Sequence, residues 1–263
     1  MTSSMRSIIN RAKKATPEEF LNSSIIRFSR HDDYIQEKLL VDFFAIKGNL
    51  MIIEGLRTYI KNNLEYFKTV EKIKILDIGP AIGAISTLLT LQLLDEFSLL
   101  DKARIWLLDA SQRVLDKTHD GDFFYPTSIL KPELKDPIIK KIRAAKTEIG
   151  TAEKNPWPDN TFDIVIAGFL FHHLHREIKP LAAKETTRVL RPNGFLGIAE
   201  EWFEDYGEEY AKYHKNDKIP LAYEDIIAYE ELSFMFPGIN IFFTHGTDYK
   251  EHSYTFCGTK SLE

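Results

Sequence analysis

Apolar and polar residues follow two different spacings along this chain. From residue 73 onward, short apolar runs are each followed by a segment in which apolar residues recur every three or four positions. The first spacing is typical of a buried strand and the second of an amphipathic helix. Their alternation predicts a parallel sheet covered by helices on both faces. The predicted strands occupy residues 73–78, 104–109, 147–150, 162–168, 195–200, 239–244 and 253–258.

The first 70 residues predict helices instead. Thr16-Pro17-Glu18-Glu19 combines a cap residue, a proline at the first helical position and a capping-box acid, so a helix should begin there. Two further helices are indicated by apolar residues at helical spacing, which are Leu39, Leu40, Phe43 and Phe44, then Leu50, Ile53, Leu56, Ile60 and Leu64. We therefore divide the chain into a helical extension or lid over residues 1–70 and a main domain over residues 71–263.

Two segments interrupt the alternation of strands and helices. Residues 118–145 contain one glycine and three prolines, and they are longer than a helix-to-strand connection requires. Residues 201–236 are rich in aromatic side chains and could cover a pocket. A crossover helix is expected over residues 177–190, ended by Arg191-Pro-Asn-Gly194, and the last two strands should form an antiparallel pair.

Composition narrows the class of protein. A chain of 263 residues with 44% hydrophobic residues can bury a full core as one domain. The formal charge of −5 argues against a nucleic-acid partner, because phosphate binding needs concentrated Lys and Arg. The longest apolar run, residues 164–171, is far shorter than the roughly 20 residues of a membrane span. The single Cys257 excludes an intrachain disulfide, and we expect a cytoplasmic protein.

The first predicted strand leads into a glycine-containing turn. Asp77 lies near its end, Gly79 and Gly83 follow, and helical spacing begins directly afterwards. Glycines let the backbone come close to a ligand, and the amides of a helix start favour an anionic group. This predicts a loop for a cofactor that carries a carboxylate or phosphate. If Ala81 required a positive φ, its β-carbon would cost about 1–2 kcal/mol, so Pro80 could reshape the turn instead.

With the later motifs, this loop resembles the class I S-adenosylmethionine-dependent methyltransferases of small-molecule type, over about residues 70–200. The motifs are Leu76-Asp77-Ile-Gly79-x-x-x-Gly83, Asp109 at the end of the second strand, Phe162-Asp163-Ile-Val, Phe171-His172-His173-Leu174 and Leu190-Arg-Pro-Asn-Gly194. The resemblance implies a doubly wound α/β fold with a mostly parallel seven-stranded sheet and an antiparallel C-terminal strand. It also implies S-adenosylmethionine as the cofactor, and methyl transfer by in-line displacement to an O, N or C atom of a small molecule.

The resemblance assigns roles to the residues of the first two strands. In this family the glycine loop holds the methionine part of the cofactor, which implies contacts at Gly79, Ala81 and Gly83. Asp77 would orient the amino group. Asp109 would accept hydrogen bonds from both ribose hydroxyls, a task for two fixed acceptor oxygens.

The adenine side of the predicted site is less typical of the family. The resemblance places Ala110, Thr151 and Ala152 beside the nucleoside, with threonine at a position where relatives often carry an acid. Phe169 would line the cofactor, because ligands of such sheets lie outside the carboxyl ends of the strands.

The acceptor side is expected to include His172 and His173. One imidazole could take a proton from a hydroxyl or amine, since histidine titrates near neutrality, or it could serve as a hydrogen-bonded hinge. A metal is not expected, because the histidines lack a separated carboxylate or cysteine partner. Glu200, Trp202 and Tyr34 are candidates for contact with the substrate, and Glu200 could bind a cation or face water.

Two other functions fit parts of the pattern. A methyltransferase-like binding or regulatory module would keep the fold without turnover. A NAD-dependent oxidoreductase shares the strand, the glycine loop and the acid after the second strand, but its G-x-G-x-x-G fingerprint is absent. The expected partner is a small-molecule substrate, and a homo-oligomer is left open.

Overall fold

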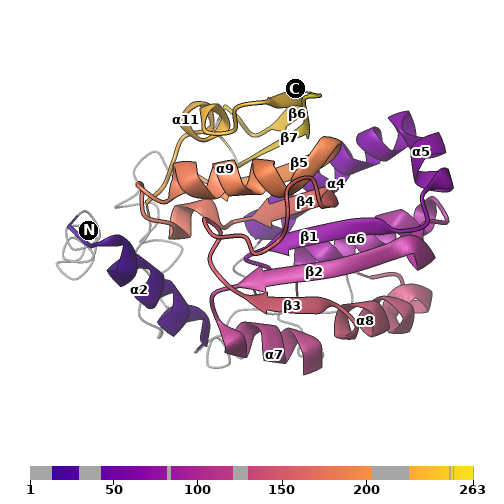
Figure 1. Cartoon of the computed structure of the whole chain (residues 1–263), viewed down its shortest axis with the longest axis horizontal. Coiled ribbons are helices and arrows are strands. Elements are labelled where there is room, and N and C mark those ends of the chain that lie inside the picture. Colours follow the sequence, from indigo (N-terminus) through magenta and orange to yellow (C-terminus); the bar gives the residue numbers. More distant parts are fainter. Residues whose placement is uncertain are drawn as a thin grey trace.

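A seven-stranded sheet forms the centre of the protein, with strand order β3-β2-β1-β4-β5-β7-β6 (Figure 1). The computed structural model describes residues 14–29, 43–81, 84–120, 130–202, 225–248, 250 and 252–262. The strands are β1 (Ile73–Ile78), β2 (Ala103–Asp109), β3 (Lys146–Ile149), β4 (Phe162–Gly168), β5 (Leu190–Glu201), β6 (Ile239–His245) and β7 (Ser253–Lys260). The first five run parallel, and β7 is antiparallel to both β5 and β6. This confirms the predicted sheet.

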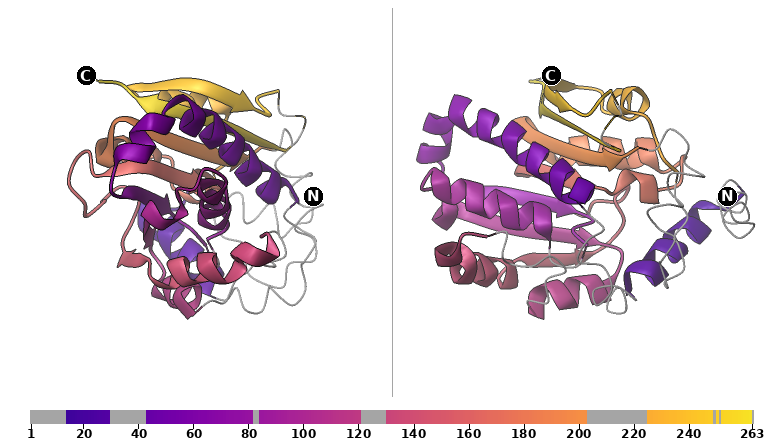
Figure 2. Two further views of the ribbon diagram at one scale, coloured as in Figure 1. Left: turned by 90° about the vertical axis from the view of Figure 1, so that its right-hand side faces the viewer. Right: turned by 180° about the vertical axis from the view of Figure 1, so that it is seen from behind.

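Helices cover both faces of the sheet (Figure 2). One face carries α4 (Phe43–Asn62), α6 (Ile85–Glu96) and α8 (Lys135–Arg143), whereas α9 (Lys179–Val189) and α11 (Tyr229–Phe234) lie on the other. The remaining elements are α2 (Pro17–Ser29), α5 (Leu64–Thr69), α7 (Gln112–Asp120) and the 3₁₀ turns η1 (Leu100–Lys102), η3 (Pro132–Leu134) and η4 (Phe171–His173).

The central strands β1 and β4 are mostly apolar because neighbouring residues enter different cores. In β4, Ile164 and Ile166 pack with the α4 and α6 side, whereas Val165 packs with the α9 side. β1 divides in the same way, with Ile75 in the first core and Leu76 in the second. Continuous apolar runs are therefore required by a parallel sheet that is buried on both faces.

The predicted helix start at Thr16 is confirmed by a capping box. The amide of Glu19 donates to Thr16 Oγ1 at 3.2 Å, and the amide of Thr16 donates to Glu19 Oε2 at 2.7 Å. The resulting helix α2 lies on the side toward which β1 and β2 point (Figure 1), in contact with η4 and α7. Part of the predicted extension thus lies beside the carboxyl ends of the strands. By contrast, α4 packs directly on β5 and β7.

Two predicted connections differ from the structure. The segment 118–145, predicted as a connection longer than a helix-to-strand link requires, contains η3 and α8, and Ile138 and Ile142 of α8 are buried against the sheet. Pro137 is compatible with α8 because it lies in the first turn, where its missing N–H costs nothing. Strand β5 begins at Leu190, earlier than predicted, and residues 191–194 form an irregularity between two paired segments.

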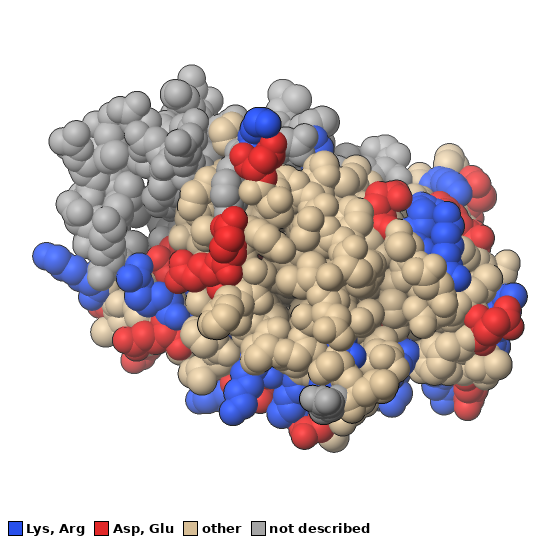
Figure 3. All heavy atoms as spheres, turned by 90° about the horizontal axis from the view of Figure 1, so that it is seen from above, with Lys and Arg blue, Asp and Glu red and all other residues tan. Residues whose placement is uncertain are grey.

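The sheet edge formed by β6 lacks acidic residues, lysine and arginine. Strand β6 contains no Asp, Glu, Lys or Arg, and Figure 3 shows that the face seen from above is mostly uncharged across its centre. Exposed strand edges favour unwanted pairing, and bulges are one way to prevent it. The pairing of β6 with β7 is irregular between Ile241 and Phe243, which gives this edge such an interruption.

Candidate functional site

Two aspartates, the buried Asp77 and the half-buried Asp109, lie at the carboxyl ends of the neighbouring strands β1 and β2. The Asp77 carboxyl is 1% exposed. Its Oδ2 accepts a 2.7 Å hydrogen bond from Thr87 Oγ1 of α6, and its Oδ1 has no hydrogen-bond partner among the described residues. Burial raises the pKa of Asp77 to about 7, the bond from Thr87 opposes this, and the charge of Asp109 adds to it.

Asp109 is the last residue of β2. Its Oδ1 accepts a hydrogen bond from the Ser111 amide at 2.8 Å, which fixes the carboxyl group at the strand end. Burial raises the pKa of Asp109 to about 7, although the Ser111 and Ala110 amides act against this. Two aspartates that hold protons near neutrality are therefore adjacent, and both would gain from a ligand that donates to them.

The turn after β1 adopts left-handed backbone conformations. Gly79 has φ +66° and donates its amide to Leu108 O at 2.8 Å, and a β-carbon at this position would lie 2.8 Å from Leu170 Cδ1. Ala81 has φ 51°, so it keeps the conformation in which a β-carbon costs about 1–2 kcal/mol. The alternative that Pro80 removes this requirement is therefore wrong. Gly83 lies outside the described residues.

The loop after β3 comes next to the end of β2. The Gly150 amide donates to Asp109 O at 3.0 Å. Thr151 Oγ1 donates to Glu153 Oε1 at 2.8 Å, and Ala152 is buried with the α9-side core. The predicted adenine-side residues and the ribose-side residues thus meet at one end of the sheet.

Phe169 follows β4 in a strained conformation. Its φ of 58° is unusual for an aromatic residue, and its amide donates to Ala199 O of β5 at 2.7 Å. The ring packs closely over Gly48 of α4, where a β-carbon would come within 2.7 Å of it. Strain of this kind persists only where the surroundings enforce it, and it occurs often at functional sites.

The turn η4 places two histidines against the end of β5. Glu200 is completely buried, and its Oε1 and Oε2 accept hydrogen bonds from the Phe171 and His172 amides. Oε2 also lies 2.6 Å from His172 Nδ1, and His172 Nε2 lies 2.9 Å from His173 Nε2. Glu201 Oε1 is 3.8 Å from His172 Nε2.

This geometry orders the protons of the two imidazole rings. A carboxylate oxygen can only accept, so His172 Nδ1 is the donor in its contact with Glu200 Oε2. In neutral His172, Nε2 then accepts from Nε2–H of His173, and Nδ1 of His173 is a buried atom. Glu200 thus orients the imidazole of His172, as a carboxylate orients a catalytic base, and His172 in turn contacts the second imidazole, that of His173.

The structure assigns the predicted substrate residues to different places. Glu200 supports the η4 turn from behind, so both of its oxygens are already engaged. Trp202 directly follows β5, and its amide donates to His252 O at 2.9 Å. Tyr34 lies outside the described residues. Sequence reasoning missed Thr87 and Lys179, because a polar residue at helical spacing gives no sign that it points into the protein.

In the described part of the chain, no group of three His, Cys, Asp or Glu side chains could hold a metal ion. No helix there is long and apolar enough to cross a membrane.

Comparison with known proteins gives one family and several relatives. Residues 76–198 match the model of a methyltransferase domain. An uncharacterized methyltransferase-like protein of Schizosaccharomyces pombe is 32% identical over 92 residues, which are 32% of this chain and 35% of that protein. The protein YafE of Escherichia coli is 36% identical over 61 residues, which are 23% of this chain and 28% of YafE. The matches thus span about a third of these curated relatives or less.

A solved structure extends the comparison to most of the chain. The N-methyltransferase NodS of Bradyrhizobium japonicum, crystallised with S-adenosyl-L-homocysteine, aligns with 92% of this chain and 98% of its own. The TM-score is 0.55 and the identity is 10%, which shows a shared fold.

Proposed function

Since this chain has the fold of the class I S-adenosylmethionine-dependent methyltransferases, we propose that it binds S-adenosylmethionine and methylates a small molecule. The observation that carries the proposal is the pair of the buried Asp77 and the half-buried Asp109, which lie at adjacent strand ends beside a left-handed glycine turn. Ligands of open α/β sheets bind at this edge.

The residues present fit the methionine part of the cofactor. Asp77 has one carboxyl oxygen without a partner among the described residues, and that oxygen can accept from an ammonium group. A buried unsatisfied acceptor is costly, so a cationic donor at this position stabilises the site. Gly79 keeps the approach open, because any side chain there would meet Leu170.

The same residues fit the nucleoside part. Asp109 offers a carboxylate whose position is fixed by the Ser111 amide, and a carboxylate can accept from two neighbouring hydroxyls. Ala110, Thr151 and Ala152 flank this position from the loops after β2 and β3. We assign them to the adenosine side.

On the acceptor side, the chain supplies a proton acceptor. S-adenosylmethionine, when bound, provides a methyl group already activated by its sulfonium. We assign His173 the role of taking the proton from an acceptor hydroxyl or amine, and His172 with Glu200 behind it would stabilise the charge that results. We therefore propose an acceptor that loses a proton from oxygen or nitrogen.

Calorimetric titration tests the cofactor assignment. S-adenosylmethionine and S-adenosylhomocysteine should bind the full chain, and NAD should not. Binding of NAD without either of the other ligands would overturn the proposal.

Transfer of a radiolabelled methyl group tests the enzymatic assignment. Label from S-adenosylmethionine should appear in members of a panel of small molecules with hydroxyl or amine acceptors. Tight binding of S-adenosylhomocysteine without transfer to any of them would instead identify a non-catalytic module.

A further inference from the structure

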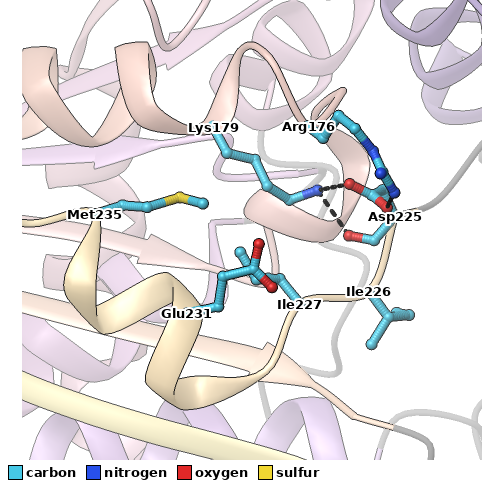
Figure 4. A pocket seen from close by; sticks show the side chains of 7 residues that line it. All are labelled: Arg176, Lys179, Asp225, Ile226, Ile227, Glu231 and Met235. Carbon is cyan, nitrogen blue, oxygen red and sulfur yellow. Dashed lines mark hydrogen bonds and ion pairs between the residues drawn. The ribbon is translucent and has the colours of Figure 1, made fainter.

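Lys179 is a charged residue buried inside the protein. Its side chain is 1% exposed, and its ammonium group donates to three acceptors, two of which belong to Asp225 and are shown in Figure 4. These are Leu174 O at 2.8 Å, Asp225 O at 2.7 Å and Asp225 Oδ2 at 2.8 Å. All three donors of the ammonium are therefore used. Burying such a charge costs several kcal/mol before its partners compensate, and an apolar side chain of similar size often serves stability equally well.

The pocket beside Lys179 does not explain this cost. It is lined by Arg176, Asp225, Glu231 and Met235 with two isoleucines, and in Figure 4 the lysine points toward Asp225 rather than into open space. Because the ammonium is saturated by protein acceptors, it has no donor left for a ligand. Through Leu174 and Asp225, its hydrogen bonds connect it instead to the turn η4 that carries His172 and His173.

The partners of Lys179 hold the outer side of η4. The Asp225 amide donates to His172 O at 2.8 Å, so Asp225 links the lysine to the backbone of the first histidine. Lys179 itself binds the carbonyl of Leu174, two residues further along. On the inner side, Glu200 holds the amide and ring of His172. The turn η4 is thus hydrogen-bonded by Lys179 and Asp225 on one side and by Glu200 on the other.

Electrostatics agree with this arrangement. Burial lowers the pKa of Lys179, while the charges of Asp225 and Glu200 act to raise it. Burial would raise the pKa of Asp225, but Lys179 and Arg176 hold it below its ordinary value. Removing the lysine would leave two carbonyls and a carboxylate without their donor, which is the strongly unfavourable case for a buried pair.

We propose that Lys179 and Asp225 are positioning residues, which fix the η4 turn so that His172 bridges Glu200 and His173. Any effect of Lys179 and Asp225 on catalysis rests on the proposed function, but their effect on the position of the His172 imidazole does not. Lys179 touches neither the cofactor residues nor the reactive ring atoms, and it acts through the backbone of residues 172–174.

The test uses NMR of the histidine rings in the full chain. The proton between His172 Nδ1 and Glu200 should give a far-downfield resonance, which His172→Gln identifies by removing it. Lys179→Met, which keeps the volume and removes the ammonium, should abolish or broaden this resonance. Lys179→Arg should restore it, because the guanidinium supplies charged donors again. Lys184→Met, at an exposed lysine of the same helix, is the matched control and should leave it unchanged.

A milder variant covers the case in which Lys179→Met does not fold. Asp225→Asn keeps the backbone bond to His172 and weakens the pairing with Lys179 and with the exposed Arg176, so it should broaden or shift the same resonance. An unchanged resonance in a folded Lys179→Met protein, or in Asp225→Asn when the first variant is unfolded, would overturn the inference.

Two further measurements separate this inference from the proposed function. In Lys179→Met, turnover should fall at least tenfold while the dissociation constant of S-adenosylhomocysteine stays within twofold, and Lys179→Arg should recover most of the turnover. If the wild-type protein does not bind S-adenosylhomocysteine, the proposed function fails whatever the NMR shows. If it binds and the imidazole resonance ignores Lys179, only the positioning role fails.

Discussion

Replacing Asp109 by asparagine should move protein stability and cofactor affinity in opposite directions. The substitution keeps the shape of the side chain and one acceptor for the Ser111 amide, but it removes the charge. In the ligand-free protein that charge is unfavourable, because burial raises the pKa of Asp109 to about 7. In the complex the same charge is needed to accept two hydroxyls.

The size of each effect follows from the raised pKa and from the hydrogen bonds. The pKa rises from an ordinary value of 3.8 to about 7, and each tenfold change in acidity is worth about 1.4 kcal/mol, so the ionised carboxylate costs the folded state up to about 4 kcal/mol. Below pH 4 both states are protonated and this cost vanishes. It accumulates as the pH rises from about 4 to 7. A hydrogen bond to a charged acceptor contributes about 1.5–3 kcal/mol, so losing the charge should weaken cofactor binding roughly hundredfold.

Two assays on the same protein check these effects. Urea unfolding at pH 4, 6 and 8 should show that Asp109→Asn gains stability over wild type only as the pH rises, by about 1–3 kcal/mol at pH 8. Calorimetry with S-adenosylhomocysteine should show the loss of affinity. Asp116→Asn, at an exposed carboxylate of the adjacent helix α7, is the control and should change neither quantity.

One result would refute this reasoning. If Asp109→Asn binds S-adenosylhomocysteine within twofold of wild type, Asp109 does not hold the ribose. A stability difference that is the same at pH 4 and pH 8 would show that its carboxyl group titrates normally.

Three further predictions concern the same site. Burial raises the pKa of Asp77 to about 7, and an ammonium ligand favours its ionised form. The affinity for S-adenosylhomocysteine should therefore rise from pH 5.5 to 8, and binding below pH 7 should release protons into the buffer. An affinity independent of pH would contradict this. Gly79→Ala places a β-carbon at φ +66° and 2.8 Å from Leu170 Cδ1. Urea unfolding should show a free energy of unfolding lower by at least about 1–2 kcal/mol. An unchanged urea midpoint would argue against the left-handed turn. His173→Gln should reduce turnover by about 10²–10⁴ without changing the affinity for S-adenosylhomocysteine, and undiminished turnover would exclude His173 as the base.

The strands could be predicted because burial on both faces leaves a simple mark in the sequence. Phe162–Gly168 is apolar at nearly every position, it follows the polar pair Asn160-Thr161 and it ends in a glycine, so the strand is visible without tertiary information. Helix α8 was missed because Pro132 and Pro137 suggested an irregular connection. Both prolines lie at the starts of short helical elements, where proline is tolerated, and the buried pair Ile138 and Ile142 was the available signal.

For the site, the parts carried by a single loop were predictable and the parts that join distant segments were not. Asp77 and Asp109 are marked by their places at strand ends. The engagement of Glu200 by η4 depends on how β4 and β5 are paired, and nothing near Glu200 in the sequence indicates it. Lys179 reads as an ordinary surface lysine of a helix, since its burial arises only when residue 225 returns to the same place.

The position of β7 between β5 and β6 constrains the order in which the sheet can assemble. β6 is made before β7 but pairs only with it, so β6 has no place in the sheet until β7 has entered. Until then the edge of β5 is an unpaired apolar strand, the kind of surface that associates with other chains during synthesis. Glu200 and Glu201 are paired with Tyr254 and Ser253 of β7. The carboxylate that supports η4 therefore lies on a strand whose outer neighbour is the last strand of the sheet to be synthesised.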